Sequence, residues 1–202
     1  IDTSSVQYEN DSLMRKVRGC DDYGIACCVS YQAIGKSIQF FGARANLAKA
    51  LLLALNGGRC ENTGTLMVEG IKPLKSDVLD FDEVMANYKK VLHEVARVYN
   101  ETMNIIHYMH DKYDYEKSQM AFIDTNPTIN LAYGVAGLSI TADSLSAIKY
   151  AKVTAHRNAE GLTDGFEIEG EFPMFGNDND QVDTIARELV HFFSNELNKL
   201  PV

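Results

Sequence analysis

The sequence lacks the features that mark membrane proteins, nucleic-acid-binding proteins and disulfide-stapled proteins. Its 202 residues include no apolar run of membrane-spanning length and no charged-then-apolar segment near Ile1. The chain has 19 Lys and Arg and 28 Asp and Glu, which gives a formal net charge of −9. This negative charge disfavours binding to nucleic acid or anionic membranes. The four cysteines, Cys20, Cys27, Cys28 and Cys60, lack the spacing of a disulfide framework or zinc site. We therefore expect reduced thiols and a cytoplasmic location.

The composition that remains is that of one globular segment. Hydrophobic residues make up 46% of the chain, and no repeat, low-complexity tract or linker divides residues 1–202. The absence of a leading Met suggests the interior of a longer protein, truncated at both ends. Apolar spacing predicts helices at 40–56, 80–110, 115–123, 143–151 and from 180 onward, a loop at 60–75, a turn at 124–130 and a strand at 166–172. The expected fold class is α/β and helix-rich.

The adjacent cysteines Cys27 and Cys28 are the most distinctive chemical feature. Neighbouring cysteines share one peptide unit, so a disulfide between them would close a small strained ring. On extended backbone their side chains point to opposite faces, which suits a relay in which one sulfur faces a substrate and the other a partner. The plainer interpretation is two small buried residues of a core strand, since the pair lies in the apolar run 24–29.

Arg44 is the second candidate. On a helix over 40–56 it would share an apolar face with Phe40, Leu47 and Leu51 by the three-and-four spacing rule. A buried guanidinium requires an anion, which is either a protein carboxylate or a ligand held through two hydrogen bonds. Its closeness in sequence to the thiol pair keeps the ligand alternative open.

Other polar patterns are weaker. His107 and His110 lie one helical turn apart, but no third ligand has useful spacing, so we expect no metal site. The alternating glutamates at 167, 169 and 171 are typical of the solvated face of a strand. The glycine-rich segment 133–137 lacks the lysine and the spacing of a phosphate or dinucleotide loop.

Taken together, several segments make the chain resemble the pyruvate formate-lyase family of glycyl radical enzymes over essentially its whole length. The segments are 1–5, 8–11, 25–30, 40–49, 105–113, 137–139, 142–153 and 166–171. The paired cysteine is the specific part, because many other glycyl radical enzymes carry a single cysteine in that loop. Tyr31-Gln32 departs from the Pro-Met that the family often has there.

The resemblance implies part of a ten-stranded α/β barrel, with the cysteine loop as a finger at its centre. It implies formate C-acetyltransferase activity, the conversion of pyruvate and coenzyme A to acetyl-coenzyme A and formate. Cys28 would exchange a hydrogen atom with a glycyl radical, and Cys27 would attack pyruvate as a thiyl radical and carry the acetyl group. Arg44 would bind the pyruvate carboxylate, and Phe41 would line the substrate pocket.

The resemblance also implies partners. These are a radical S-adenosylmethionine activating enzyme and a second copy of the parent chain, in anaerobic glucose fermentation. The glycyl radical segment and most coenzyme A contacts have no counterpart here, so we expect this chain alone to be inactive. Three alternatives stay open: a 2-ketobutyrate formate-lyase, a non-catalytic fragment or interaction module, and a thiol redox sensor using Cys27 and Cys28.

Overall fold

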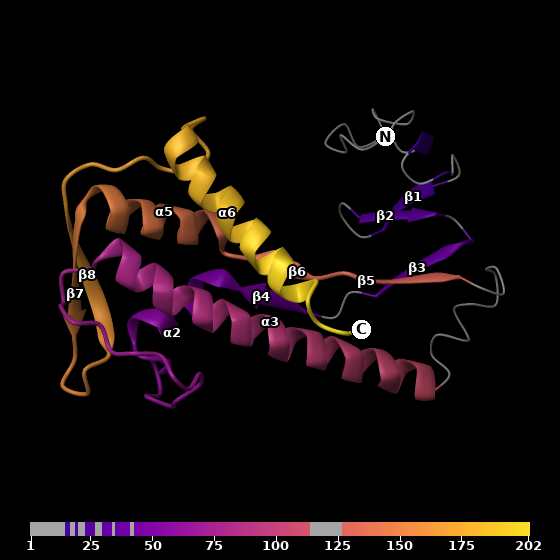
Figure 1. Cartoon of the computed structure of the whole chain (residues 1–202), viewed down its shortest axis with the longest axis horizontal. Helices are drawn as coiled ribbons and strands as arrows, with labels where there is room; N and C mark the ends of the chain where they lie inside the picture. Colours follow the sequence, from indigo (N-terminus) through magenta and orange to yellow (C-terminus); the bar gives the residue numbers. More distant parts are fainter. Residues whose placement is uncertain are drawn as a thin grey trace. The chain divides into compact units, whose positions relative to one another are not determined.

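The computed structural model describes residues 15–16, 19, 23–26, 30–33, 35–40, 43–113 and 127–202 (Figure 1). These residues fall into two compact units. The first unit takes its residues from 1–42 and 103–133, and the second unit from 43–102 and 134–202. The short helix predicted at 115–123 lies outside the described residues.

Two pairs of strands form the sheets of the first unit. β1 (Tyr23–Ala26) and β2 (Ser30–Ala33) are antiparallel, whereas β3 (Ser37–Phe40) and β5 (Thr128–Leu131) are parallel. The turn predicted over 124–130 was wrong for residues 128–130, because these belong to β5 and Thr128 already pairs with Ser37. A strand in that place was hard to foresee because its partner lies about ninety residues earlier in the chain.

In the second unit, two parallel strands each lead directly into a helix. β4 (Arg44–Asn46) runs into α2 (Leu47–Leu55), and β6 (Gly134–Ala136) runs to Gly137 and α5 (Leu138–Tyr150). The helix predicted over 40–56 therefore begins only at Leu47, after Asn46 caps it by accepting a hydrogen bond from the Lys49 backbone N–H at 3.0 Å. Its predicted end is confirmed: Gly57 and Gly58 follow Leu55 with positive φ.

The long helix α3 (Phe81–Lys112) matches the apolar spacing from Val84 onward. Asp80 caps it, since its side chain accepts from the Glu83 backbone N–H at 2.9 Å. Within the second unit, the buried face of α3 consists of Val84, Tyr88, Val91, Leu92, Ala96 and Tyr99. The apolar spacing also predicts Val98, Ile105 and Met109 on the buried face, but the structure has these three side chains exposed.

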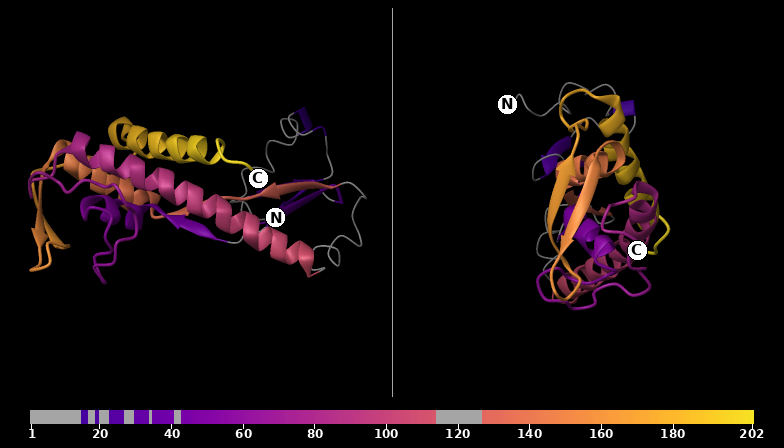
Figure 2. Two further views of the ribbon diagram at one scale, coloured as in Figure 1. Left: turned by 60° about the horizontal axis from the view of Figure 1, so that its bottom comes forward. Right: turned by 90° about the vertical axis from the view of Figure 1, so that its left-hand side faces the viewer.

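The remaining elements complete the core of the second unit (Figure 2). β7 (Lys152–Arg157) and β8 (Thr163–Glu169) form an antiparallel pair, and α6 (Asp180–Leu197) begins after Asn179 as its cap. Ala142 of α5 and Val182 and Ala186 of α6 pack together in one buried cluster. The strand predicted over 166–172 corresponds to β8 within a few residues, and the final helix begins at Asp180 as predicted.

The described residues thus form a helix-rich α/β structure with four two-stranded sheets. A closed barrel is not present among them, so the barrel stays a prediction. None of the described helices is long and apolar enough to cross a membrane.

Candidate functional site

The predicted site residues differ in how far the structure describes them. Cys27, Cys28 and Phe41 lie outside the described residues. Arg44 is described, and its predicted setting was wrong: it is the first residue of β4, not part of a helix, and its side chain is exposed. Burial alternates along β4, with Ala45 buried between exposed Arg44 and Asn46, because successive side chains of a strand point to opposite faces.

The strand that carries Arg44 is held in parallel register with β6. Arg44 lies opposite Gly134, and Asn46 lies opposite Ala136. Beyond β6, Gly137 takes a φ of +78°, and a Cβ built on it would lie 3.2 Å from the Cβ of Ala48. Glycine is therefore required for α5 to begin this close to α2.

A tyrosine hydroxyl of α3 joins the two strands at the Arg44 end. The Tyr99 hydroxyl donates a hydrogen bond to the Ala43 carbonyl and accepts one from the Gly134 backbone N–H, the latter at 3.0 Å. Tyr99 is 6% exposed, and this burial raises its pKa, while the Gly134 N–H and the charge of Arg44 act in the opposite direction. The side chain is therefore a neutral hydrogen-bonding group that can donate and accept at once.

A second tyrosine of α3 binds the other end of β4. The Tyr88 hydroxyl donates to the Leu47 carbonyl at 3.1 Å, and the Tyr88 side chain is fully buried. Burial raises its pKa, against a smaller opposing effect of the Thr141 hydroxyl. By apolar spacing alone, Tyr88 and Tyr99 are two more positions on the buried face of the helix predicted over 80–110. Their spacing of eleven residues, about three helical turns, was the available sign that both hydroxyls share one face.

Arg44 borders an open hollow of about 370 Å³ in the second unit. Tyr99, Thr102, Glu94 and Lys49 line it together with apolar side chains of α2 and α3. The basic and acidic groups around an otherwise apolar surface give the hollow both hydrogen-bond donors and acceptors.

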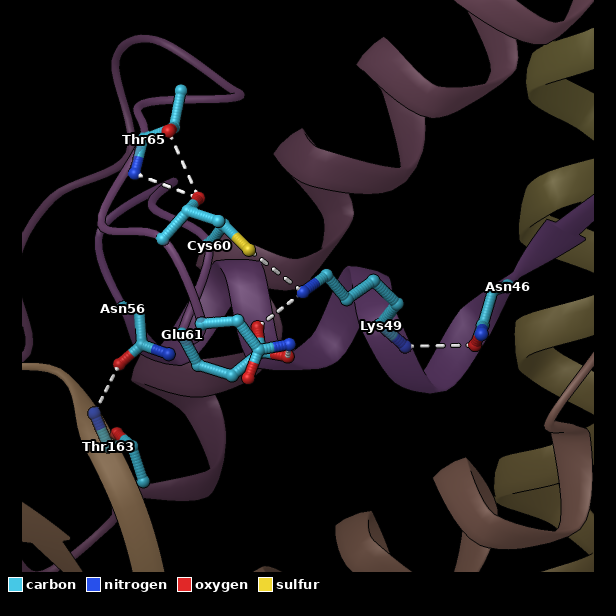
Figure 3. A network of polar contacts seen from close by, with 9 residues as sticks. Asn46, Lys49, Asn56, Cys60, Glu61, Thr65 and Thr163 are labelled. Atoms are coloured by element: carbon cyan, nitrogen blue, oxygen red, sulfur yellow. Dashed lines mark hydrogen bonds and ion pairs between the residues drawn. The ribbon is translucent and has the colours of Figure 1, made fainter.

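A thiol outside the predicted pair is the other reactive group that the structure places (Figure 3). The Lys49 ammonium lies 3.2 Å from Cys60 Sγ and 2.5 Å from Glu61 Oε2. The pKa of Cys60 is lowered to about 7, first by the Thr63 hydroxyl, then by the backbone N–H groups of Asn62 and Thr63, and then by Lys49. No sequence pattern indicates the contact with Lys49, since Lys49 precedes Cys60 by eleven residues and belongs to a different element.

In the first unit, His107 and His110 pack against an aromatic ring. Phe40 meets both imidazoles edge-on, with ring centroids 5.8 Å and 5.0 Å apart respectively. Throughout the part of the chain that the structure describes, no group of three or more His, Cys, Asp or Glu side chains is arranged to hold a metal ion.

Comparison with solved structures shows the fold. The chain superposes with a TM-score of 0.67 on a structure reported for 1,2-propanediol dehydration in Roseburia inulinivorans, at 20% identity, over 95% of this chain and 28% of that one. A glycyl radical enzyme from Archaeoglobus fulgidus gives a TM-score of 0.63 at 18% identity, over 87% of this chain and 25% of the other. The glycerol-bound form of the B12-independent glycerol dehydratase from Clostridium butyricum gives 0.63 at 22% identity, over 90% and 26%.

Sequence comparison shows the family. Formate acetyltransferase 1 of Escherichia coli (strain K12) is 54% identical over 200 residues, which are 99% of this chain and 26% of that protein. The chain thus spans about a quarter of the length of this relative. The family model described as pyruvate formate lyase-like matches residues 1–202. The chain belongs to the pyruvate formate lyase-like family.

Proposed function

We propose that this chain is the cysteine-bearing segment of the catalytic barrel of a formate C-acetyltransferase. The whole protein converts pyruvate and coenzyme A to acetyl-coenzyme A and formate. The observation that carries the proposal is the 54% identity to formate acetyltransferase 1 over 99% of the chain, together with the adjacent thiols at 27 and 28 in this sequence.

The two thiols divide the chemistry between them. Cys28 exchanges a hydrogen atom with a glycyl radical carried by polypeptide outside these 202 residues, and the resulting radical passes to Cys27. The Cys27 sulfur bonds to the carbonyl carbon of pyruvate, and the bond from that carbon to the carboxylate breaks. The acetyl group stays on Cys27 as a thioester until coenzyme A takes it. The carboxylate radical fragment takes a hydrogen atom from the Cys28 thiol to become formate, which returns the radical to Cys28.

Arg44 and Phe41 hold the substrate. The Arg44 guanidinium binds the pyruvate carboxylate through two parallel hydrogen bonds, and Phe41 packs against the substrate. Arg44 is exposed within the described residues, so enclosure of the site falls to polypeptide outside them. Enclosure matters because water, oxygen or other hydrogen donors would consume the radical.

The same proposal names the partners of the whole protein. It is a cytoplasmic homodimer of anaerobic glucose fermentation, activated by a radical S-adenosylmethionine enzyme. Without the glycyl radical segment, residues 1–202 alone do not turn over.

Exchange of labelled formate into pyruvate tests the function. The intact protein containing this chain is activated anaerobically, and the glycyl radical is confirmed by electron paramagnetic resonance. Label should enter pyruvate, and the Arg44→Gln variant should need far more pyruvate for half-maximal exchange. The proposal would be refuted if the radical-bearing protein exchanged labelled formate into neither pyruvate nor 2-ketobutyrate.

A further inference from the structure

Tyr99 occupies the end of the β4–β6 ladder, next to the residue that precedes Arg44. Its hydroxyl contacts the Ala43 carbonyl and the Gly134 N–H at once. Gly134 is the register partner of Arg44. The hydroxyl therefore acts as one more rung of the ladder, placed immediately before the Arg44–Gly134 rung, and it uses both its donor and an acceptor position.

Tyr88 makes the matching contact at the other end of β4. It donates to the Leu47 carbonyl, the first residue of α2. Since both tyrosines lie on one face of α3, the helix holds the backbone immediately before and immediately after the short strand. A strand of three residues has few hydrogen bonds of its own, and the two tyrosine hydroxyls add one contact on either side of it.

The two contacts differ in what lies beside them. The Tyr99 contact adjoins the peptide that leads into Arg44, whereas the Tyr88 contact lies three residues beyond Arg44 and supports the start of α2. Loss of the Tyr99 rung lets the Arg44 backbone move relative to Gly134. Misplacement of a substrate-holding group by about 1 Å costs up to about 100-fold in catalysis, because the substrate is no longer held in a reactive geometry.

We propose that Tyr99 is a positioning residue for Arg44, acting through the Ala43–Gly134 bridge to set where the guanidinium meets the substrate carboxylate. The inference rests on the proposed function, because it takes Arg44 as the carboxylate-binding group. It does not assign Tyr99 any contact with substrate.

The test compares Tyr99→Phe with Tyr88→Phe in the intact, activated protein. Each variant removes one hydroxyl from a buried ring, and the two differ in the end of β4 they release. Tyr99→Phe should raise the KM for pyruvate about tenfold and leave the KM for coenzyme A unchanged. Tyr88→Phe should leave the KM for pyruvate within about twofold of the wild-type value, even if it lowers the melting temperature as much as Tyr99→Phe does. Equal rises in the two variants would overturn the proposal.

A double-variant cycle separates positioning from general weakening of the fold. In an Arg44→Lys background, Tyr99→Phe should add little further loss, because the group it positions has already lost its fork geometry. A full additional tenfold loss in that background would show that Tyr99 acts by another route.

A structural readout needs neither radical nor substrate. Amide hydrogen exchange at Gly134 and Arg44, resolved by residue in the unactivated protein, should speed up at least tenfold in Tyr99→Phe and not in Tyr88→Phe. Unchanged exchange would refute the positioning role. If this exchange changes as expected but labelled formate never enters pyruvate in the wild-type protein, the proposed function fails while the control of the Arg44 backbone by Tyr99 stands.

Discussion

The ammonium of Lys49, in the first turn of α2, lies 3.2 Å from the sulfur of Cys60. The same ammonium binds Glu61 at 2.5 Å, so it links α2 to the loop that follows it. Thr63 and the backbone of residues 62 and 63 complete the polar surroundings of the sulfur. These groups favour the thiolate, which is the reactive form of cysteine.

Cys60 should therefore react with alkylating agents at a lower pH than an ordinary thiol. Its pKa is about 7, against a reference value of 9.0, so the alkylation rate should reach half its plateau near neutral pH. Thr63→Ala should move this midpoint upward more than Lys49→Met, because the Thr63 hydroxyl has the larger effect. Iodoacetamide labelling followed by peptide mass spectrometry measures the midpoint. An unshifted midpoint in both variants would contradict this account of the site.

The contact between α3 and α6 should weaken in acid. Glu196 lies 2.7 Å from His93 Nδ1 and 2.5 Å from Lys199 Nζ, and these contacts, His93 first, lower its pKa. A lowered pKa in the folded state contributes stability above the ordinary glutamate pKa of about 4.3, and that stability is lost as the pH falls through the folded value.

Glu196→Gln should consequently cost about 1 kcal/mol near neutral pH and flatten the loss of stability below about pH 4.3. Thermal unfolding of the intact protein across this range measures both effects. Glu188→Gln, an exposed carboxylate on the same helix, is the matched control and should leave the curve nearly unchanged. Superimposed curves for wild type and Glu196→Gln would show that the contact contributes nothing.

Gly137 should tolerate no side chain at the start of α5. Its φ is +78°, and an added Cβ would meet Ala48 at 3.2 Å. Gly161 has a φ of +76° with nothing within 4 Å of its added Cβ, so Gly161→Ala isolates the backbone strain. We expect Gly161→Ala to cost about 1 kcal/mol and Gly137→Ala about 2 kcal/mol or more. Equal losses, measured by denaturant unfolding, would mean that Ala48 gives way freely.

Sequence patterns predicted the elements whose cause is local. The apolar spacing from Val84 predicts the long helix, an Asp at 80 or 82 is a candidate cap, and glycines after Leu55 favour a helix end. The structure has the helix, with Asp80 as its cap, and Gly57 and Gly58 follow Leu55 with positive φ. The final helix from Asp180 was predicted for the same reason.

Such local patterns could not predict the short parallel strands. β4 has three residues, and the sequence Arg44-Ala45-Asn46 fits a helix as well as a strand. It is a strand because Gly134–Ala136, about ninety residues later, pairs with it. The same long-range pairing places the Tyr99 hydroxyl beside Ala43, which no spacing within α3 could show. Family resemblance singled out Arg44 as a candidate, and its role stays a prediction, whereas the helical setting inferred from spacing was wrong because Arg44 begins a strand.

The most direct measurement is the detection of the acetyl group on its thiol. The intact protein is activated anaerobically, mixed with pyruvate labelled in the methyl carbon without coenzyme A, quenched in acid and digested. The account predicts a labelled acetyl thioester on the peptide containing Cys27, lost in Cys27→Ser and absent without activation. A labelled acetyl group on another residue, or none while formate exchange proceeds, would contradict the proposed role of the cysteine pair.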